Sequence, residues 1–500
     1  MGAAVVATLA GVVCVLLASA AVGTIRPRRY STPADFYVAA RAVRPWWNAS
    51  AISSEYTSAA VYLGLVGLIA AHGRPMLWYS VGAAAGFVVL LVLVVAPLRR
   101  SGTYTLADFA QWRLGSVHVR RVVTVLVLFI GLVHLVAQLH AAGLVLRLLT
   151  GLPPWTGWLA VTVVVLVVAL AGGMGSSTGV QALQFWFKLG SLAGVAAVLG
   201  VIWWNRPSHP PSGPVYVTQT LAGAGDPSTL GLVTVLTASA LGVMGLPHIV
   251  VRFYANPDGR AARRTVVGVL AMLSVFSVMP AVYGLLGRWY APPRIPTDQV
   301  LLLLPSLMAP GWLGDVLTGL LAAGAFAAFL ATSCGVLVAV GGTLSTSLFN
   351  GGVGGFRRGV LLVAGGALVL VWASPPGASI LLVLLAFGLS AATLCPLLVL
   401  GVWWRGLSVP GALAGLLTGA GVTAVLVAVR FASPSFTPLW RYPALVAVPA
   451  AFAVMVAISL VTRHRVPAGT AALLARMHLP EELSTPEIDR SSLTGSRSSW

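Results

Sequence analysis

The segment Ser50–Gly64 reads SAISSEYTSAAVYLG and places a carboxylate, Glu55, inside an apolar stretch of membrane-spanning length. A carboxylate at membrane depth costs about 2.5–3.5 kcal/mol on insertion scales, so Glu55 is expected to face the protein interior or a wet cavity. Small and hydroxyl-bearing residues surround it, where a plain spanning helix would carry Leu, Val and Phe. This pattern predicts a helix interrupted near mid-membrane to hold a solute or an ion. The alternative is a small-residue stripe for close helix packing, with Glu55 bonded to a neighbouring helix.

The composition is that of a polytopic membrane protein. Hydrophobic residues make up 58% of the 500 residues and charged residues only 8%, against about 25% charged residues in soluble domains. The formal charge of +19 comes from basic residues that lie between apolar segments, which is typical of membrane orientation and not of nucleic-acid binding. The three cysteines are far apart and have neither a metal-ligand spacing nor a disulfide framework.

Apolar stretches of about 20 residues predict an all-α protein with about thirteen membrane spans. They are expected near 3–23, 46–71, 77–97, 122–149, 156–172, 180–204, 229–251, 265–287, 314–348, 358–374, 378–403, 407–430 and 441–462.

Arginine clusters follow the first, third, seventh, ninth and thirteenth spans, whereas the alternate loops carry few. The positive-inside rule therefore predicts an N-terminus outside the cell and a cytoplasmic C-terminus, in the cell membrane. Residues 3–23 are expected to be a retained helix, because basic residues follow the apolar run and none precede it. Residues 1–462 would form the transmembrane domain. Residues 463–500 would form a mostly disordered cytoplasmic tail with a short helix near 468–478.

Three further segments depart from plain spanning sequence. The segment Thr237–Phe253 reads TASALGVMGLPHIVVRF, and its two glycines and one proline predict a break or kink. Its histidine, His248, is either a capping residue at the cytoplasmic end or a proton relay. The segment Ala327–Ser347 reads AAFLATSCGVLVAVGGTLSTS and predicts a close-packing helix with a polar spot.

The third segment, Gly172–Gly190, carries polar residues about one helical turn apart. Lys188 is expected to be structural and to extend its ammonium group toward the cytoplasmic interface. Gln181 is open to either a functional or a structural role.

The chain resembles the sodium:solute symporter family, and within it the acetate permease (cation/monocarboxylate) branch. Three blocks carry the resemblance: ADFYVAARAVRPWWNASAISSEYTSAAVYLG (Ala34–Gly64), SGTYTLADFAQWRLG (Ser101–Gly115) and LGVMGLPHIVVRFYANPDGRAARR (Leu241–Arg264). The resemblance implies a LeuT-type fold of two inverted five-helix repeats, at about 46–204 and 229–403. The two segments expected to be broken would open these repeats.

The resemblance also implies a sodium site. Matched to the family, its ligands fall on Ser54, Thr57, Ala328, Ala331 and Thr332. The family usually has two adjacent hydroxyl residues at the last two positions, and Ala331 breaks that pattern. Since Na⁺ seeks oxygen ligands, proton coupling with Glu55 as the titrating group is the alternative.

The function expected from this resemblance is symport of a short monocarboxylate, such as acetate, propionate or pyruvate, with Na⁺ or H⁺. Ser58, Thr237 and Ser239 are the expected substrate hydroxyls, with Glu55, Gln181 and His248 in coupling or gating. The partners would be a small organic anion and membrane lipid, without a further cofactor. The alternatives are another solute, such as proline or pantothenate, and a membrane sensor. An enzyme is not expected, because no convergent His/Asp/Cys group occurs in the sequence.

Overall fold

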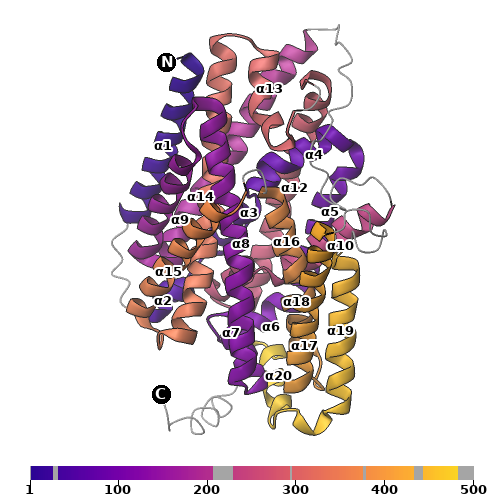
Figure 1. The fold of residues 1–500 in the computed structure, drawn as a ribbon. Coiled ribbons are helices and arrows are strands. Elements are labelled where there is room, and N and C mark those ends of the chain that lie inside the picture. The colour runs from indigo at the N-terminus through magenta and orange to yellow at the C-terminus, as the bar shows by residue number, and fades with distance from the viewer. Residues whose placement is uncertain are drawn as a thin grey trace.

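The computed structural model describes residues 2–25, 32–205, 229–292, 295–375, 379–432 and 443–481. Within these ranges every regular element is helical, and most helices run along one common axis (Figure 1). The chain begins at one end of the bundle, and α20 (Thr470–His478) lies at the opposite end. The expected all-α membrane architecture is confirmed.

The first expected break lies where the sequence predicted it. Helix α3 (Pro45–Tyr56) ends at Thr57, and the chain resumes as a π-helical turn, η2 (Ala60–Gly64), that leads into α4 (Leu65–His72). The two parts meet at an angle of 64°. Thr57 turns its own hydroxyl back onto Ser53 O at 2.7 Å, a local bond that competes with helix continuation.

The second break separates α10 (Thr229–Gly245) from α11 (Pro247–Val251) and η5 (Arg252–Ala255), at an angle of 43°. Pro247 has no N–H to continue the helix. Gly245 permits close packing, since a Cβ there would lie 2.7 Å from Ser390 O. The Gly and Pro pattern therefore predicted this break correctly.

Helix α9 (Pro154–Trp204) contains two of the expected spans. Its 51 residues would measure about 76 Å if straight, far more than one membrane crossing requires. Gly172 and Gly173 have non-helical backbone angles. Gly157 packs against Ala142 near one end of α8 (Val117–Thr150), and Trp203 stacks on Trp289 at 5.8 Å. The glycine pair thus divides α9 into two crossings.

In the part of the chain that the structure describes, ten helices are long and apolar enough to span a membrane, and the two bent pairs raise this number to twelve. Division of α9 gives the thirteen spans expected. Helix α14 (Trp312–Leu348) is the most enclosed, because its most apolar window is entirely buried. The site described below is built on this helix.

The other helices surround these elements. They are α1 (Ala3–Ile25), α2 (Pro33–Val38), η1 (Ala39–Arg41), η3 (Arg74–Leu77), α5 (Trp78–Val89), η4 (Leu90–Val94), α6 (Val95–Ser101), α7 (Leu106–Leu114), α12 (Gly259–Tyr290), η6 (Thr297–Gln299), α13 (Val300–Met308), α15 (Gly352–Ala373), α16 (Ser379–Ala392), α17 (Leu394–Trp403), α18 (Val409–Ala432), α19 (Pro443–Val461) and η8 (Arg463–Arg465). The repeat boundaries and the sidedness of the termini stay predictions. The part of the tail expected to be disordered beyond residue 481 lies outside the described residues.

Candidate functional site

Glu55 lies in the last turn of α3, directly before the first break, and its side chain is fully buried. Its Oε1 accepts a hydrogen bond from Arg252 Nε at 2.8 Å and lies 2.6 Å from Arg252 Nη2 in an ion pair. Arg252 is equally buried and begins η5, after the second break. A buried ion pair of this kind joins the two broken spans to each other. Removal of one partner would leave an uncompensated buried charge, which is strongly destabilising.

The polar residues of α9 complete this pair. Thr178 Oγ1 accepts a hydrogen bond from Arg252 Nη1 at 2.7 Å. Ser177 Oγ and Gln181 Oε1 accept from Nη2. The Gln181 amide nitrogen lies 2.7 Å from Glu55 Oε1 and also 2.7 Å from Ala331 O on α14. Gln181, on α9, therefore contacts residues of α3, η5 and α14.

Helix α14 closes the network from the other side. Thr332 Oγ1 donates to the backbone oxygen of Glu55 at 2.8 Å. Gly335 leaves room for the carboxylate, since a Cβ at this position would lie 2.2 Å from Glu55 Oε1. The glycine is needed because the acid packs directly against the α14 backbone. We call Glu55, Arg252, Gln181 and Thr332 the ion-pair network.

Lys188, two turns beyond Gln181 on α9, binds the first break. Its Nζ lies 2.7 Å from Ser54 O, 3.1 Å from Thr57 O and 2.7 Å from Thr57 Oγ1. The side chain is fully buried. The expectation that Lys188 extends to the cytoplasmic interface is therefore wrong. This span begins at Gly173, earlier than the sequence indicated, which moves Lys188 from the end of the span toward its middle.

Four of the five expected cation ligands, Ser54, Thr57, Ala331 and Thr332, contact Lys188, Gln181 or Glu55. The Ser54 and Thr57 oxygens face Lys188, and the Ala331 carbonyl accepts from Gln181. Ser191 faces Gly324 and Gln181 faces Ala331, and the fifth expected ligand, Ala328, lies between these two positions on α14. Among the described residues, no group of three or more His, Cys, Asp or Glu side chains is placed to hold a metal ion.

A second group of residues gathers where the two breaks meet. The rings of His134, on α8, and His248, on α11, lie 4.9 Å apart. The ring of Phe387 on α16 packs on the rings of His134 and Tyr56, with centroid distances of 6.3 and 6.5 Å. Gln138 Oε1 accepts the N–H of Ala59 at 3.0 Å, within the first break.

We call Tyr56, His134, Gln138, His248 and Phe387 the histidine cluster. His134 is 2% exposed, and neither of its ring nitrogens has a hydrogen-bond partner in the part of the chain that the structure describes. An unsatisfied buried polar group is costly, so the His134 ring nitrogens remain available for a hydrogen bond.

The expected substrate hydroxyls are not brought together. Ser58 lies in the first break, next to Ala59. Thr237 and Ser239 lie on α10 ahead of the second break, and their hydroxyls bond back to Val233 O and Val235 O. Ser239 also faces Gly82 of α5. Of these three residues, only Ser58 lies beside the histidine cluster.

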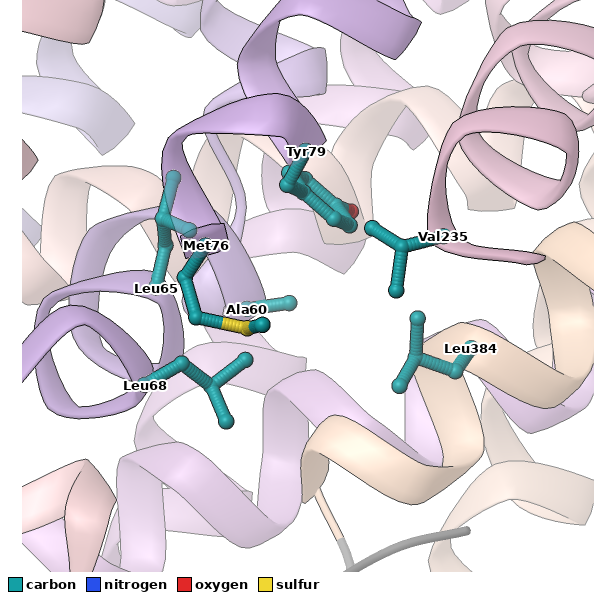
Figure 2. Close-up of a pocket in the computed structure, with 7 residues that line it drawn as sticks. All are labelled: Ala60, Leu65, Leu68, Met76, Tyr79, Val235 and Leu384. Atoms are coloured by element: carbon teal, nitrogen blue, oxygen red, sulfur yellow. The ribbon is translucent and has the colours of Figure 1, made fainter. Parts of the chain in front are cut away.

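A narrow apolar pocket adjoins the first break. Figure 2 shows Ala60, Leu65, Leu68 and Met76 on one side of it, Val235 and Leu384 on the other, and Tyr79 between the two groups at the top of the view. The pocket therefore lies between segments of the two expected repeats. Ala60 directly follows Ala59, and Leu384 is one helical turn from Phe387, so the pocket extends from the histidine cluster.

Sequence reasoning missed Arg252, Lys188 and His134 as site residues. Arg252 and Lys188 could have been found from the sequence. Each is a cation within or beside an apolar segment, and Glu55, a carboxylate at membrane depth, needs a cationic partner. His134 shows no such signal, since a lone histidine in a spanning helix is equally suited to packing.

A family model described as "SSF: Sodium:solute symporter family" matches residues 36–419. Two curated proteins are similar along most of the chain. "Uncharacterized symporter YwcA" of Bacillus subtilis is 29% identical over 432 residues, which cover 82% of each chain. "Monocarboxylic acid transporter" of Corynebacterium glutamicum is 27% identical over 485 residues, covering 84% of this chain and 85% of its own.

Two solved structures share the fold. A Na⁺-coupled sialic acid symporter, in a substrate-bound outward-open state, aligns with a TM-score of 0.71 at 13% identity, over 91% of this chain and 98% of its own. MHP1, a nucleobase-cation-symport-1 family transporter in a closed conformation, aligns with a TM-score of 0.56 at 15% identity, over 90% and 99%. These likenesses confirm the inverted-repeat transporter fold and leave the substrate open.

Proposed function

Because this chain belongs to the sodium:solute symporter family, we propose that it imports short monocarboxylates, such as acetate, propionate or pyruvate, together with Na⁺ or H⁺. The protein is a multi-pass membrane transporter and not an enzyme, and it couples a small solute to a cation. The substrate class is the proposal. It is supported by the similarity to a monocarboxylic acid transporter and by the charges at the two breaks.

The observation that carries the proposal is an excess of buried positive charge. Arg252 and Lys188 bring two cations to the first break, and Glu55 brings one carboxylate. An uncompensated charge in a protein interior is costly unless it is paired. A small anion would supply the missing negative charge, whereas a neutral solute would not. The charge balance therefore favours a carboxylate as the cargo.

The histidine cluster suits the carboxylate end of such a solute. The unpartnered ring nitrogens of His134 offer a hydrogen-bond donor, and His248 lies beside it. Ser58 and the break at Ala59 lie next to the same place. The apolar pocket that begins at Ala60 would receive a methyl or ethyl group. A short apolar chain with one carboxylate matches both halves of this site.

The ion-pair network lies beside this site and ties both breaks to α9 and α14. In an inverted-repeat transporter, one group of helices rocks against another around a fixed central site. Gln181 contacts both Glu55 and α14. His248 lies on α11, which leads directly into Arg252 at the start of η5. We propose that Glu55, Gln181 and His248 couple substrate binding to that motion.

Radiolabelled acetate uptake by a transport-deficient host, measured at varied Na⁺ and pH, tests the substrate. We expect uptake that propionate and pyruvate inhibit and that proline and pantothenate leave unchanged. No uptake of any monocarboxylate under either gradient would reject the proposal. Acetate binding to the purified protein without uptake into liposomes would instead favour a sensor.

A pair of variants on α8 tests the site. His134→Gln is expected to lower the apparent affinity for acetate by about tenfold or more, the usual effect of losing a hydrogen bond to a charged group. His140→Gln is the matched control, because His140 lies on the same helix but bonds to Ser374, away from the cluster. Equal effects from the two variants would remove His134 from the binding site.

A further inference from the structure

The ammonium group of Lys188 lies at the expected cation site. Its three contacts, with Ser54 O, Thr57 O and Thr57 Oγ1, have distances between 2.7 and 3.1 Å. An ammonium group has three donors and no acceptor. Each of its N–H groups thus has one oxygen available, so the hydrogen bonds of the ammonium group are satisfied by neutral oxygens that leave its charge unbalanced.

Two of the other three expected ligands, Ala331 and Thr332, are engaged as well. The Ala331 carbonyl accepts from Gln181 Nε2, and Thr332 Oγ1 donates to the carbonyl of Glu55. Ala331 has no side-chain oxygen to add. Ser333 Oγ, the remaining hydroxyl nearby in the sequence, has no hydrogen-bond partner among the described residues. The oxygens that a sodium ion would need are therefore used mostly within the protein.

Electrostatics favours the ammonium at this point. It lies at the C-terminal end of α3, where freed carbonyls give the helix a partial negative charge. Glu55, in the same turn, adds a full negative charge nearby. A sodium ion bound to the same oxygens would lie within a few Å of a fixed positive charge, and the two would repel each other. The residues present therefore fit an internal cation and do not fit Na⁺.

We propose that the Lys188 ammonium group takes the place of the sodium ion at this site, so that transport by this chain does not require Na⁺ there. This inference rests on the proposed transport function, and it makes the choice between the two coupling ions. Of the two coupling ions proposed, the proton is the one that does not need this site.

Sodium-specific thermal stabilisation tests the proposal without any substrate. The melting temperature of the purified full chain would be measured in NaCl and in choline chloride at equal ionic strength and fixed pH. A ligand that binds the folded state raises the melting temperature. We expect no difference between the two salts for the native protein. A sodium-specific increase of about 2 °C or more would overturn the proposal.

The variant Lys188→Ala removes the ammonium group and frees its three oxygens. We expect this variant to gain a sodium-specific increase in melting temperature. A folded variant without a sodium-specific increase in melting temperature would show that Lys188 binds the first break but does not replace a sodium ion. This result would also overturn the proposal. Gln184→Leu is the matched control. Gln184 lies one turn earlier on α9 and bonds to Ser19 of α1, so we expect no sodium response from this variant.

Acetate uptake into proteoliposomes is the second readout, with Na⁺ or choline as the external cation. We expect equal uptake in both, within about twofold. A fivefold or larger requirement for Na⁺ would contradict the proposal. If no monocarboxylate is taken up but the native protein shows no sodium-specific stabilisation, the substrate proposal fails and the Lys188 proposal stands. The two failures are therefore distinguishable.

Discussion

The two breaks occupy corresponding positions in the expected repeats, yet their backbones are satisfied in different ways. At the first break, a buried lysine and a glutamine bind Ser54 O, Thr57 O and the Ala59 N–H. At the second break, the carbonyl of Gly242 accepts a bond from Ser390 Oγ at 3.0 Å, and also one from Leu246 N–H at 3.1 Å. One break is held by charge and the other by a neutral hydroxyl.

The difference follows from local backbone geometry. The first span bends by 64° and the second by 43°. Thr57 has left the helical region, so the carbonyls ahead of it need outside partners. The second break keeps a helical bond across Leu246 and closes with Pro247, which has no N–H to satisfy. The sharper break therefore depends more on side chains from distant helices.

Removal of the acid is expected to have the largest effect on this comparison. Glu55→Gln would leave Arg252 and Lys188 buried without a carboxylate, at a cost of about 3–5 kcal/mol in stability. We expect a large fall in melting temperature and a loss of uptake. The double variant Glu55→Gln with Arg252→Gln removes both charges of the pair and should recover part of the lost stability. A single variant as stable as the native protein would contradict the importance of the ion pair.

A smaller effect is expected from Gly335→Ala. The new methyl group would meet the Glu55 carboxylate at 2.2 Å and displace it, at about 1–3 kcal/mol by the usual cost of overpacking. Gly365→Ala on α15 is the control, because nothing lies within 4 Å of a Cβ there. Its melting temperature should be unchanged or slightly higher. If both variants behave alike, the close fit of acid and glycine has no energetic role.

The second break should tolerate the loss of its hydroxyl. Ser390→Ala removes the hydroxyl that donates to the Gly242 carbonyl, which keeps its hydrogen bond from Leu246 N–H. We expect a cost of about 0.5–1.5 kcal/mol and retained uptake. Ser274→Ala, at an exposed hydroxyl that bonds to its own helix, gives the baseline. A loss in Ser390→Ala as large as that in Glu55→Gln would remove the contrast between the breaks.

The smallest effect is expected far from both breaks, at Glu481. Burial raises the pKa of this carboxyl, but the Gly259 N–H at 2.8 Å and Arg100 at 3.2 Å outweigh it and lower the pKa below its usual value. A lowered pKa in the folded state adds stability above the unfolded pKa, near 4.5, and this stability is lost as the pH falls through the folded value.

The pair is partly exposed, so its contribution should be below about 1 kcal/mol. Glu481→Gln should therefore lower the melting temperature slightly at pH 7 and not at all at pH 3, with uptake unchanged at pH 7. A larger loss at pH 3 than at pH 7 would contradict this sign.

Much of the fold could be read from local sequence. Runs of apolar residues located the spans, and the glycine and proline of Gly245–Pro247 located the second break. The hydroxyl-rich turn around Glu55 located the first. Each of these features depends on its own segment of the chain, so predicting it requires no information about other helices.

The span boundary between 172 and 180 could not be placed in this way. Gly172 and Gly173 are followed by the mostly small and hydroxyl-bearing residues Met174–Gly179, which do not resemble a spanning segment in sequence but are helical in the structure. The error of several residues was enough to assign Lys188 to an interface instead of the interior.

The sequence by itself determined that a membrane-buried acid and two interrupted spans exist, because burial cost and backbone breaks are properties of single segments. Only the tertiary structure decided that Glu55 pairs with Arg252, 197 residues away, that Lys188 binds the first break, and that His134 faces His248. Each of these contacts depends on how helices distant in the chain pack together. No periodicity within one helix records which neighbour it will meet.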